Sequence, residues 1–570
     1  MRVLFLCHAF NSLSQRLFIE LRAMGHEVSV ELDINDAVTG EAVVLFRPDL
    51  VVAPFLKRAI PEAVWRAVPC FVVHPGVPGD RGPAALDWAI MEDAPTWGVT
   101  VLQATADMDA GPIWASAAFP MRPATKSSLY RNEVTAAAVA AVRLAVERFE
   151  GGGFTPLDQD DPGARLAGRS RPAMGQQERA IHWERDDTAT VLRKIRAADG
   201  MPGVRDRVAG RLVYLHDVRA EGTLGGRPGE LVARSGPAVC RATRDGAVWL
   251  GHLRDPQGEF SFKLPAMRVL GDAAADLPEV APTARSGYRD MYCRRRGPVA
   301  YLHWDLYNGA MGVDACERLG RLYAEACQGE TRVVVLMGGD DFWSNGMDLN
   351  LIEAAASPPQ ASWDNINAIN DLAHAIITTG DTLTIAALGA NAGAGGVFLS
   401  RAADRVWARH GVVLNPHYKD MGNLYGSEYW TYLLPRYAGA DKARRISAAR
   451  LPMGVEEARA LGLVDRMMTG APEDFRAEVG RRALELANAP DFEERLEAKA
   501  ARRRADEAER PLADHRRDEL AHMHLNFFGF DPSYHVARYN FVHKVPKSHT
   551  PLTIARHRRR DWRLPAAEPA

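Results

Sequence analysis

Residues 386–405, AALGANAGAGGVFLSRAADR, join a short apolar strand to a glycine-rich turn and then to an apolar stretch that suits a helix. Glycines this close together let a backbone approach a ligand closely. Two ligands fit such a turn: the pyrophosphate of a dinucleotide, or the oxygen of a reacting thioester. Phe398 raises a second question, because it directly follows the glycines, where a catalytic group could be expected.

The order of these glycines disfavours the dinucleotide. A dinucleotide site needs G-x-G-x-x-G straight after the first strand of a βαβ unit, with an acidic residue about 20 positions further on. Here the turn reads GANAGAGG, and the next segment, RVWARHGVVLN, supplies no such acid. The thioester oxygen is the alternative that stays open.

Three stretches of the C-terminal half together resemble the crotonase (enoyl-CoA hydratase/isomerase) superfamily, over about 298–480. They are FWSNGMDLNLIE, GANAGAGGVFLSRAAD and ISAARLPMGVEEARALGLVDRM. The resemblance implies that the backbone N–H groups of Met347 and Gly395 bind the thioester oxygen of a coenzyme A ester. This role suits Gly395, because the start of a helix has unpaired N–H donors and the positive end of the helix dipole. The same resemblance implies contacts to coenzyme A by Gly346, Asp348 and Gly396.

Phe398 stands where hydratases of this superfamily carry a glutamate, and His417 stands where they carry a second one. Hydration by paired carboxylates is therefore not expected, although the oxyanion-binding turn is retained. The segment after Pro416, HYKDMGNLYGSEYW, is instead rich in polar aromatic groups. We expect Tyr418 and Glu428 to supply the acid and the base there, while others of these groups only pack.

The N-terminal part alternates apolar strands with helices. RVLFLC, HEVSVEL, DLVVAPF and CFVVHPG are short apolar runs, several of which end in turn residues. Such alternation predicts a parallel α/β sheet, whose ligands bind beyond the carboxyl ends of the strands. His74 lies at the end of the fourth run, so this topology alone assigns it to a site.

The motifs around that histidine, CFVVHPGVPGDRGPAALDWAI and GVTVLQATADMDAGPIW, resemble the N-terminal domain of folate-dependent formyltransferases. IHWERDDTATVLRKIRAADGMPGVRDRVAGRLVYL resembles the start of the C-terminal barrel of methionyl-tRNA formyltransferase. The resemblance implies 10-formyltetrahydrofolate as the formyl donor and His74 as the proton-transferring group, oriented by Asp109. An imidazole suits proton transfer near neutral pH. The folate-binding positions expected here are Asn11, Ser12, Arg81 and Gly82.

Val72 departs from that family, which carries an asparagine two positions before the histidine. The asparagine amide would help to hold the oxyanion, and losing such a donor typically costs about 3 kcal/mol. Either another donor, Gln103 or Asn11, takes its place, or the acceptor of the formyl group is easier than an amine. A thiolate would be such an acceptor, because it is more nucleophilic at neutral pH.

Linkers divide the 570 residues into three expected domains. Pro- and Gly-rich stretches at 150–178 and 272–297 read as linkers. They separate a formyltransferase-like domain (1–175), a small OB-like β-barrel (179–275) and a crotonase-like α/β domain with a helical C-terminus (290–570). The expected fold is a multidomain α/β protein.

Composition excludes several classes of function. A net charge of −2 gives no reason to expect binding to nucleic acid or to an anionic membrane, and no apolar run reaches the roughly 18 residues of a membrane span. Six cysteines without a CxxC pair indicate neither a zinc site nor a disulfide framework. The start, MRVLFLCHAF, lacks the features of a signal peptide. We expect a cytoplasmic protein without a bound metal.

A formyltransferase half joined to a coenzyme A ester half resembles the HypX (HoxX) family of nickel–iron hydrogenase maturation factors. The resemblance implies a lyase that forms carbon monoxide. Formyl would pass from 10-formyltetrahydrofolate to coenzyme A, and formyl-CoA would then be decarbonylated. A thiol acceptor would account for Val72, and the absence of an activated water would account for Phe398. The substrates would be small molecules, and the partner would belong to the hydrogenase maturation machinery.

Two other functions stay open at this point. One is a formyltransferase acting on an amine, fused to an acyl-CoA hydrolase or isomerase. The other is a non-catalytic scaffold that binds folate and coenzyme A. The retention of His74 and Asp109 argues against the scaffold.

Overall fold

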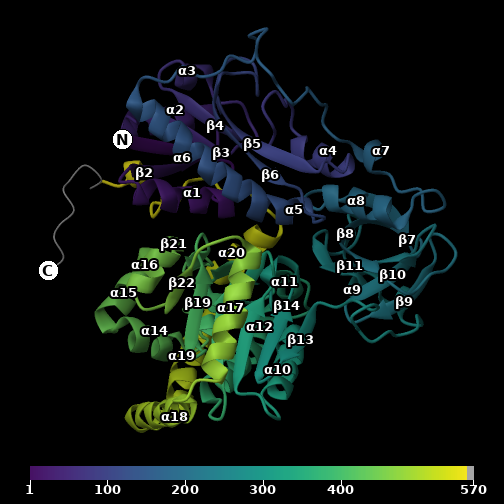
Figure 1. The fold of residues 1–570 in the computed structure, drawn as a ribbon, viewed down its shortest axis with the longest axis vertical. Coiled ribbons are helices and arrows are strands. Elements are labelled where there is room, and N and C mark those ends of the chain that lie inside the picture. Colours follow the sequence, from purple (N-terminus) through teal and green to yellow (C-terminus); the bar gives the residue numbers. More distant parts are fainter. Residues whose placement is uncertain (561–570) are drawn as a thin grey trace. The chain divides into compact units, whose positions relative to one another are not determined.

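The computed structural model describes residues 1–560, which fold as two compact units. The first unit comprises Met1–Tyr288 and residues 546–560, and the second comprises Arg289–Val545. Figure 1 labels the elements of both units. No helix in the described part of the chain is long and apolar enough to cross a membrane.

A six-stranded sheet forms the core of the first unit, in the order β2-β1-β3-β4-β5-β6 (Figure 1). Its strands are β1 (Arg2–Cys7), β2 (Glu27–Leu32), β3 (Leu50–Phe55), β4 (Cys70–His74), β5 (Thr96–Gln103) and β6 (Ile113–Pro120). The first four strands are parallel, as their continuous apolar runs predict. β5 pairs antiparallel with both β4 and β6, so the sheet is mixed rather than fully parallel. The short loop between β5 and β6 has no room for the crossover that a parallel pair needs.

Seven helical segments accompany this sheet, and two of them start at an asparagine. The side chains of Asn11 and Asn35 accept hydrogen bonds from the backbone N–H groups of Ser14 and Val38, which caps α1 and α2. The segments are α1 (Ser12–Ala23), α2 (Asp36–Phe46), α3 (Glu62–Trp65), α4 (Ala85–Met91), α5 (Lys126–Leu129), the π-helix η1 (Tyr130–Val134) and α6 (Thr135–Gly151).

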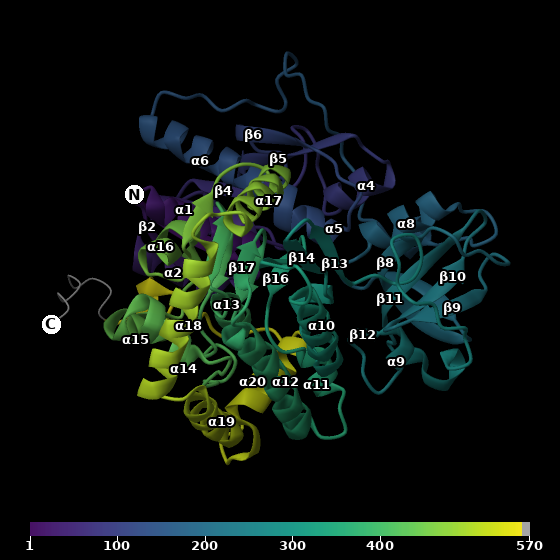
Figure 2. The same ribbon diagram turned by 60° about the horizontal axis from the view of Figure 1, so that its bottom comes forward.

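An antiparallel sheet follows in the order β7-β8-β11-β10-β9, with β12 paired to β11. Helix α8 packs on β8 in the views of both Figure 1 and Figure 2, and Val191 and Ile195 of α8 share one core with Val213 and Leu215 of β8. The elements are α7 (Gln176–Arg179), α8 (Thr188–Ala197), β7 (Val204–Val208), β8 (Arg211–Glu221), β9 (Leu231–Ser235), β10 (Ala238–Ala242), β11 (Ala247–Arg254), β12 (Lys263–Pro265), α9 (Ala266–Leu270) and η2 (Gly271–Ala274).

The second unit holds a large sheet, β13-β14-β15-β17-β19-β22, and a small one, β16-β18-β20-β21. Successive residues of β15 face opposite sides, as the strand period requires. Val334 and Leu336 pack with α10 and α12, whereas Val333 and Val335 pack with α17 and α18. The large sheet is therefore covered by helices on both faces (Figure 2).

The strands of the second unit are β13 (Met291–Arg296), β14 (Val299–Trp304), β15 (Val333–Gly338), β16 (Phe342–Ser344), β17 (Leu383–Leu388), β18 (Asn391–Gly393), β19 (Arg405–Arg409), β20 (Val413–Asn415), β21 (Met453–Gly454) and β22 (Arg466–Met468). Its helices are η3 (Tyr307–Gly309), α10 (Val313–Ala326), α11 (Leu349–Glu353), α12 (Pro358–Thr378), α13 (Gly395–Arg401), α14 (Trp430–Ala438), α15 (Ala440–Ala449), α16 (Val455–Ala460), α17 (Pro472–Ala487), α18 (Phe492–Glu509), α19 (Leu512–Phe528) and α20 (Ser533–Val542).

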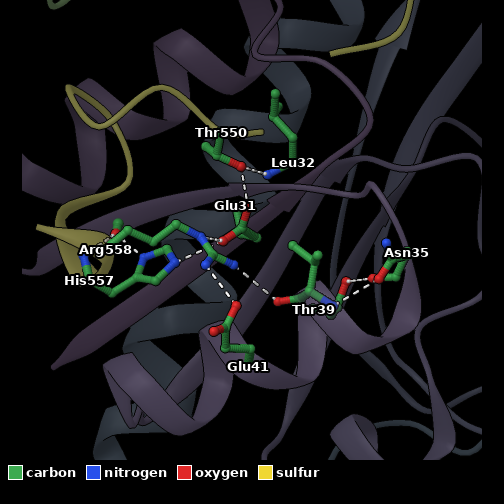
Figure 3. Close-up of polar contacts among 10 residues, drawn as sticks. Glu31, Leu32, Asn35, Thr39, Glu41, Thr550, His557 and Arg558 are labelled. Atoms are coloured by element: carbon green, nitrogen blue, oxygen red, sulfur yellow. Dashed lines mark hydrogen bonds and ion pairs between the residues drawn. The ribbon is translucent and has the colours of Figure 1, made fainter. Parts of the chain in front are cut away.

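Residues 546–560 pack with the first unit, whereas the sequence analysis placed them in the expected domain 290–570. Figure 3 shows the contact that causes this return, around the fully buried Glu31 of β2. Oε2 of Glu31 lies 2.8 Å from Nε2 of His557 and accepts from Nε of Arg558 at 2.6 Å. Thr550 also donates its hydroxyl to Glu31. Glu31 lies 526 positions from His557 and 527 from Arg558, so no local sequence pattern could have predicted their contact.

The same C-terminal segment, which includes η4 (Arg556–Arg558), covers the edge of the sheet. β2 is the first strand in the sheet order, so one side of its backbone has no neighbouring strand. The N–H of Val30 donates to the carbonyl of Ile554 at 3.0 Å, and the N–H of Leu32 donates to Oγ1 of Thr550 at 2.9 Å. The segment thereby protects an edge that would otherwise be open to other strands.

Replacing Glu31 by alanine should destabilise this edge by about 3–5 kcal/mol, because the fully buried His557 would lose its carboxylate partner and Arg558 would lose one of its two. Hydrogen exchange of the amides of β2 measures the opening free energy directly. Glu41→Ala is the matched control, because Glu41 pairs with the same Arg558 at 2.8 Å but its side chain is 58% exposed. The control should lose at most about 1 kcal/mol.

Equal exchange rates in the two variants would contradict the assignment of Glu31 as the buried anchor. Burial raises the pKa of Glu31, but hydrogen bonds from His557, Thr550 and Arg558 outweigh it, and the net pKa lies below its ordinary value. The stabilisation by ionised Glu31 is therefore complete above the pKa of about 4.3 that a glutamate has in the unfolded chain. It is lost as the pH falls through the lower pKa of Glu31 in the folded protein.

Candidate active sites

His74 ends β4 and lies between two carboxylates. Its Nε2 atom is 3.1 Å from Oδ1 of Asp80, and its Nδ1 atom is 3.5 Å from Oδ1 of Asp109. His74 is 5% exposed and Asp80 is 2% exposed. Each ring nitrogen thus has a carboxylate partner that fixes the orientation of the imidazole. A side chain that takes and returns a proton needs such a fixed orientation.

Asp109 is held by backbone groups of the loops that face it. Its Oδ2 atom accepts a hydrogen bond from the N–H of Gly82 at 3.1 Å, and its carbonyl oxygen accepts one from the side-chain amide of Gln159 at 3.1 Å. The φ angle of Asp109 is 58°, in the left-handed region that few residues other than glycine adopt. The structure therefore brings together His74, Asp109 and Gly82, three of the residues expected from the sequence.

Asp80 belongs to this cluster, although the sequence analysis missed it. It stands in the Pro-Gly-Asp of the quoted motif, which is typical of a turn and so carried no functional signal. Its Oδ2 atom lies 3.6 Å from Nε of Arg171. Gly76 allows the close approach of the pair, since a Cβ there would lie 2.4 Å from Nε2 of His74 and 2.8 Å from Oδ1 of Asp80.

Gln103, one of the two donors considered in place of the missing asparagine, points away from His74. Antiparallel pairing sets Gln103 opposite Phe71, and residues directly opposite each other share a face of the sheet. Val72 and His74 lie on the other face. On its own side, Oε1 of Gln103 accepts a hydrogen bond from Nε1 of Trp114 at 3.0 Å, and the Trp114 ring packs on Phe71.

Asn11 and Ser12 begin α1, and Arg81 follows Asp80. Oδ1 of Asn11 caps the helix, and its side chain also forms a hydrogen bond with the hydroxyl of Tyr130. The Arg81 side chain is 33% exposed and pairs with the exposed Asp160 at 3.3 Å. The contacts of Asn11 and Arg81 are thus made with residues other than His74, Asp80 and Asp109. Their expected role in folate binding stays a prediction.

In the second unit, the glycine-rich turn and the Gly346–Met347 turn lie side by side. A Cβ on Gly346 would be 3.6 Å from the backbone N of Gly395, the first residue of α13. This is the juxtaposition expected of two turns that each present an N–H to one oxygen. Gly396 is needed for packing, because a Cβ there would lie 2.3 Å from the carbonyl oxygen of Ser344.

Asp348 has a local structural role in this region. Its Oδ1 atom accepts hydrogen bonds from the N–H groups of Asn350 and Leu351, both at 3.0 Å, and so caps α11. The cap fixes the helix that follows Met347. This oxygen of the carboxylate is therefore engaged by backbone groups, and the expected contact of Asp348 with coenzyme A stays a prediction.

Glu428 and Tyr418 meet at the start of α13. The Tyr418 hydroxyl donates to Oε2 of Glu428 at 2.6 Å, and Glu428 is 1% exposed. A Cβ on Gly395 would lie 2.1 Å from Oε1 of Glu428, so the carboxylate lies directly against the glycine that begins the helix. Burial raises the pKa of Glu428 to about 7; the hydrogen bond from Tyr418 opposes this and the nearby Glu519 adds to it.

Phe398 fills the place of the hydratase glutamate with a ring that supports Tyr418. The two rings are stacked, with centroids 5.4 Å apart and planes 17° apart, and Phe398 is 1% exposed. The site thus has one carboxylate with a tyrosine partner in place of two carboxylates. Stacking holds the Tyr418 ring so that its hydroxyl reaches Glu428.

The other polar aromatic groups of this segment face elsewhere. The ring of Tyr425 stacks on His522 with centroids 4.1 Å apart, and the ring of Tyr429 packs near His374 at 6.0 Å. His417 differs from these two: burial is the main cause that lowers its pKa, and its buried Nδ1 atom has no hydrogen-bond partner among the described residues. Tyr425 and Tyr429 pack, whereas Tyr418 bonds to Glu428, which lies against Gly395.

Two further residues of the second site were not expected from the sequence, Asn370 on α12 and Glu519 on α19. Both contact the backbone around Glu428 through buried side chains. Within residues 1–560 there is no group of three or more His, Cys, Asp or Glu side chains that could hold a metal ion.

Three family models match the chain. The formyl transferase model covers residues 20–146, the formyl transferase C-terminal domain model covers 173–260, and the enoyl-CoA hydratase/isomerase model covers 321–526. Fold and motifs therefore define a protein with both formyltransferase domains and a crotonase-type domain. A methionyl-tRNA formyltransferase of Aromatoleum aromaticum is similar to the N-terminal half alone, with 27% identity over 41% of this chain and 74% of the relative.

Other relatives extend over the whole chain. The hydrogenase maturation factor HoxX of Bradyrhizobium diazoefficiens is 56% identical over 561 residues, which is 98% of this chain and 97% of the relative. The crystal structure of HypX from Aquifex aeolicus in complex with tetrahydrofolic acid is 46% identical, covers 98% of this chain and 99% of that one, and has a TM-score of 0.94. The chain belongs to the HypX/HoxX family of hydrogenase maturation factors, which confirms the resemblance found in the sequence.

Proposed function

We propose that this protein makes carbon monoxide for the active site of a nickel–iron hydrogenase. It transfers a formyl group from 10-formyltetrahydrofolate to coenzyme A and then decarbonylates formyl-CoA. The observation that carries this proposal is the buried Glu428–Tyr418 pair against Gly395, with Phe398 in place of a second carboxylate. An oxyanion-binding turn that has one base and no water-activating pair suits cleavage of a thioester without hydration.

The first step is acyl transfer, for which His74 supplies the proton movements. The sulfur of coenzyme A attacks the formyl carbon, and His74 takes the thiol proton. The bond from the formyl carbon to N10 of the folate then breaks, and His74 returns the proton to N10. Asp80 and Asp109 hold the imidazole from both sides and stabilise its charged form while it carries the proton.

Folate fits the groups around His74. Asn11 and Ser12 follow the carboxyl end of β1, and Gly82 bonds to Asp109, at the end of the sheet where ligands of such sheets bind; Arg81, next to Gly82, would contact the folate from the same loop. The HypX structure from Aquifex aeolicus that contains tetrahydrofolic acid, 46% identical to this chain, supports folate as the donor here. A thiol acceptor is consistent with Val72, because the more reactive nucleophile needs less help from an oxyanion donor.

The second step releases carbon monoxide from formyl-CoA. The backbone N–H groups of Met347 and Gly395 polarise the thioester oxygen. Glu428 takes the formyl hydrogen as a proton, and the electron pair of that C–H bond becomes the lone pair of carbon monoxide. The C–S bond breaks with its electrons on sulfur, which receives the proton back from Glu428, assisted by Tyr418. A carboxyl whose pKa is about 7 can both accept and return a proton near neutral pH.

Coenzyme A suits the second site because the turns at Gly346 and Gly395 lie close enough for their backbone N–H groups to serve one thioester oxygen. The enoyl-CoA hydratase/isomerase model that matches this region supports a CoA ester as the ligand. The six cysteines are all free, which supports a reducing, cytoplasmic location. The partner would be the machinery that assembles the hydrogenase, as the name of the HoxX relative suggests.

The direct test is anaerobic incubation of the full-length protein with 10-formyltetrahydrofolate and coenzyme A, with carbon monoxide trapped by reduced haemoglobin. We expect the haemoglobin spectrum to change only when both substrates are present. Formyl-CoA alone should also yield carbon monoxide. Failure of formyl-CoA to yield carbon monoxide, with folded protein, would overturn the proposed second step.

A further inference from the structure

Glu519, on α19, uses its whole carboxylate to hold the backbone around Glu428. Its Oε2 atom accepts hydrogen bonds from the N–H of Tyr429 at 3.0 Å and from the hydroxyl of Ser427 at 3.2 Å. Its Oε1 atom accepts from the N–H of Thr431 at 2.8 Å and from the Thr431 hydroxyl at 2.6 Å. Glu519 is 1% exposed, so these four bonds replace water entirely.

Asn370, on α12, holds the same segment from another helix. Its Oδ1 atom accepts from the N–H of Glu428 at 2.8 Å, and its Nδ2 atom lies 2.9 Å from the Ser427 hydroxyl. Asn370 is fully buried. Three successive backbone or side-chain donors, on Ser427, Glu428 and Tyr429, are therefore fixed by two helices.

This segment needs such support because its backbone is strained. Glu428 and Tyr429 both have a φ of 59°, in the left-handed region that residues with a side chain adopt only at a cost in energy. Consecutive residues in this region persist only where their surroundings determine them. The conformation has a consequence for the site, since it turns the Glu428 side chain toward Tyr418 and Gly395.

The charge of Glu519 also acts on Glu428. Burial raises the pKa of Glu519 to about 7, although its hydrogen bonds act in the opposite direction. Glu519 in turn raises the pKa of Glu428. Tyr418 and Cys316 of α10 also interact with Glu428. Tyr418, Tyr425 and Tyr429 interact with Glu519, and His515 shares Thr431 with Glu519. Two carboxyls that share one buried region titrate as a pair, and the second ionises with difficulty.

We propose that Glu519 is a positioning residue for Glu428: from outside the reacting pocket it fixes the left-handed turn that aims the Glu428 carboxylate. Its negative charge keeps Glu428 ready to hold a proton at neutral pH. This inference rests on the proposed decarbonylation, in which Glu428 is the base. Glu519 itself touches neither substrate nor the reacting atoms.

The test uses the full-length protein with formyl-CoA and measures carbon monoxide release across the pH range in which Glu428 ionises. Glu519→Gln keeps the shape but removes the charge, and its NH2 group meets N–H donors that need an acceptor. We expect kcat to fall by about 10- to 100-fold, as for a displaced catalytic group, with KM little changed. We expect the rising limb of the pH profile to move to lower pH by about one unit or more, because Glu428 then ionises more easily.

Asp518→Asn is the matched control, since it removes one charge from the adjacent position of the same helix. Asp518 is half exposed and pairs with Arg510 and Arg517. Its kcat and pH profile should be those of the unaltered protein. If Glu519→Gln behaves like this control while the unaltered protein makes carbon monoxide, the inference is overturned; if the unaltered protein makes none, the proposed function fails instead.

A second measurement decides the question if Glu519→Gln does not fold. Infrared titration of the unaltered protein should show two buried carboxyl groups that lose their protons in coupled steps. In Glu428→Gln the remaining group, Glu519, should titrate at lower pH, because coupling between two sites is reciprocal. An unchanged midpoint for the remaining carboxyl would show that the two residues do not interact and would sink the proposal.

Discussion

His74→Ala should lower formyl transfer to coenzyme A by about 10²-fold or more, the usual worth of a positioned group that moves a proton. The effect should be large because Asp80 and Asp109 hold the imidazole in place, and a carboxylate left behind is a weaker base than imidazole near neutral pH. Conversion of 10-formyltetrahydrofolate to tetrahydrofolate, followed by absorbance, measures the step. Formyl-CoA supplied directly should restore carbon monoxide output, because the second site is intact.

Variants of the two neighbouring carboxylates should show smaller effects of the same kind. Asp80→Asn and Asp109→Asn keep the size of each side chain but remove the charge that stabilises the imidazolium. Each should slow transfer by less than His74→Ala does. Gln103→Ala is the matched control on the same sheet, because its side chain is on the opposite face with Phe71 and Trp114. Carbon monoxide output that survives His74→Ala with both substrates would contradict the first site.

Glu428→Gln and Tyr418→Phe should both block carbon monoxide release while formyl transfer continues. We expect a loss of about 10²- to 10⁴-fold for Glu428→Gln, because the amide cannot take the formyl proton. Tyr418→Phe keeps the stacking on Phe398 but removes the hydroxyl that lies 2.6 Å from Glu428. Chromatography of the reaction should then show formyl-CoA, or the formate that its hydrolysis produces.

Tyr425→Phe separates this effect from general damage to the segment. Tyr425 lies in the same aromatic stretch, but its ring stacks on His522 and faces away from Glu428. This variant should release carbon monoxide at the normal rate. If Glu428→Gln and Tyr418→Phe do so as well, the decarbonylation chemistry lies elsewhere, and Phe398 has only a packing role.

Sequence reasoning located the residues that the structure brings together where they stand in short contiguous stretches. The apolar run that ends at His74, the glycines before Phe398 and the pair Tyr418 and Glu428 each stand in a short stretch with its own pattern. Such local patterns predict which residues lie near a ligand site, because the carboxyl ends of parallel strands lie at one edge of the sheet, where ligands bind. The pairing of Tyr418 with Glu428 could be anticipated because only ten positions separate them.

It failed where a buried polar group acts across a long distance in the chain. Glu519 lies 92 positions from Ser427 and stands in the polar run HRRDEL, which reads as a solvated helix face. Asn370 is similarly remote from Glu428. Asp80 was closer, but its Pro-Gly-Asp context is that of an ordinary turn. No pattern in one sequence marks a polar residue as buried when its partners lie on another element.

The return of the chain from Pro546 to β2 has a consequence for how the protein is made. Ser29 and His557, bonded at 2.7 Å, are 528 positions apart, so the first sheet to leave the ribosome is the last to be completed. At roughly 5–20 residues per second, β2 waits roughly 25 to 105 s for its cover. During translation its uncovered edge can pair with a neighbouring nascent chain. Premature termination before Thr550 would leave that edge uncovered, although all the residues proposed for the two active sites would already have been synthesised.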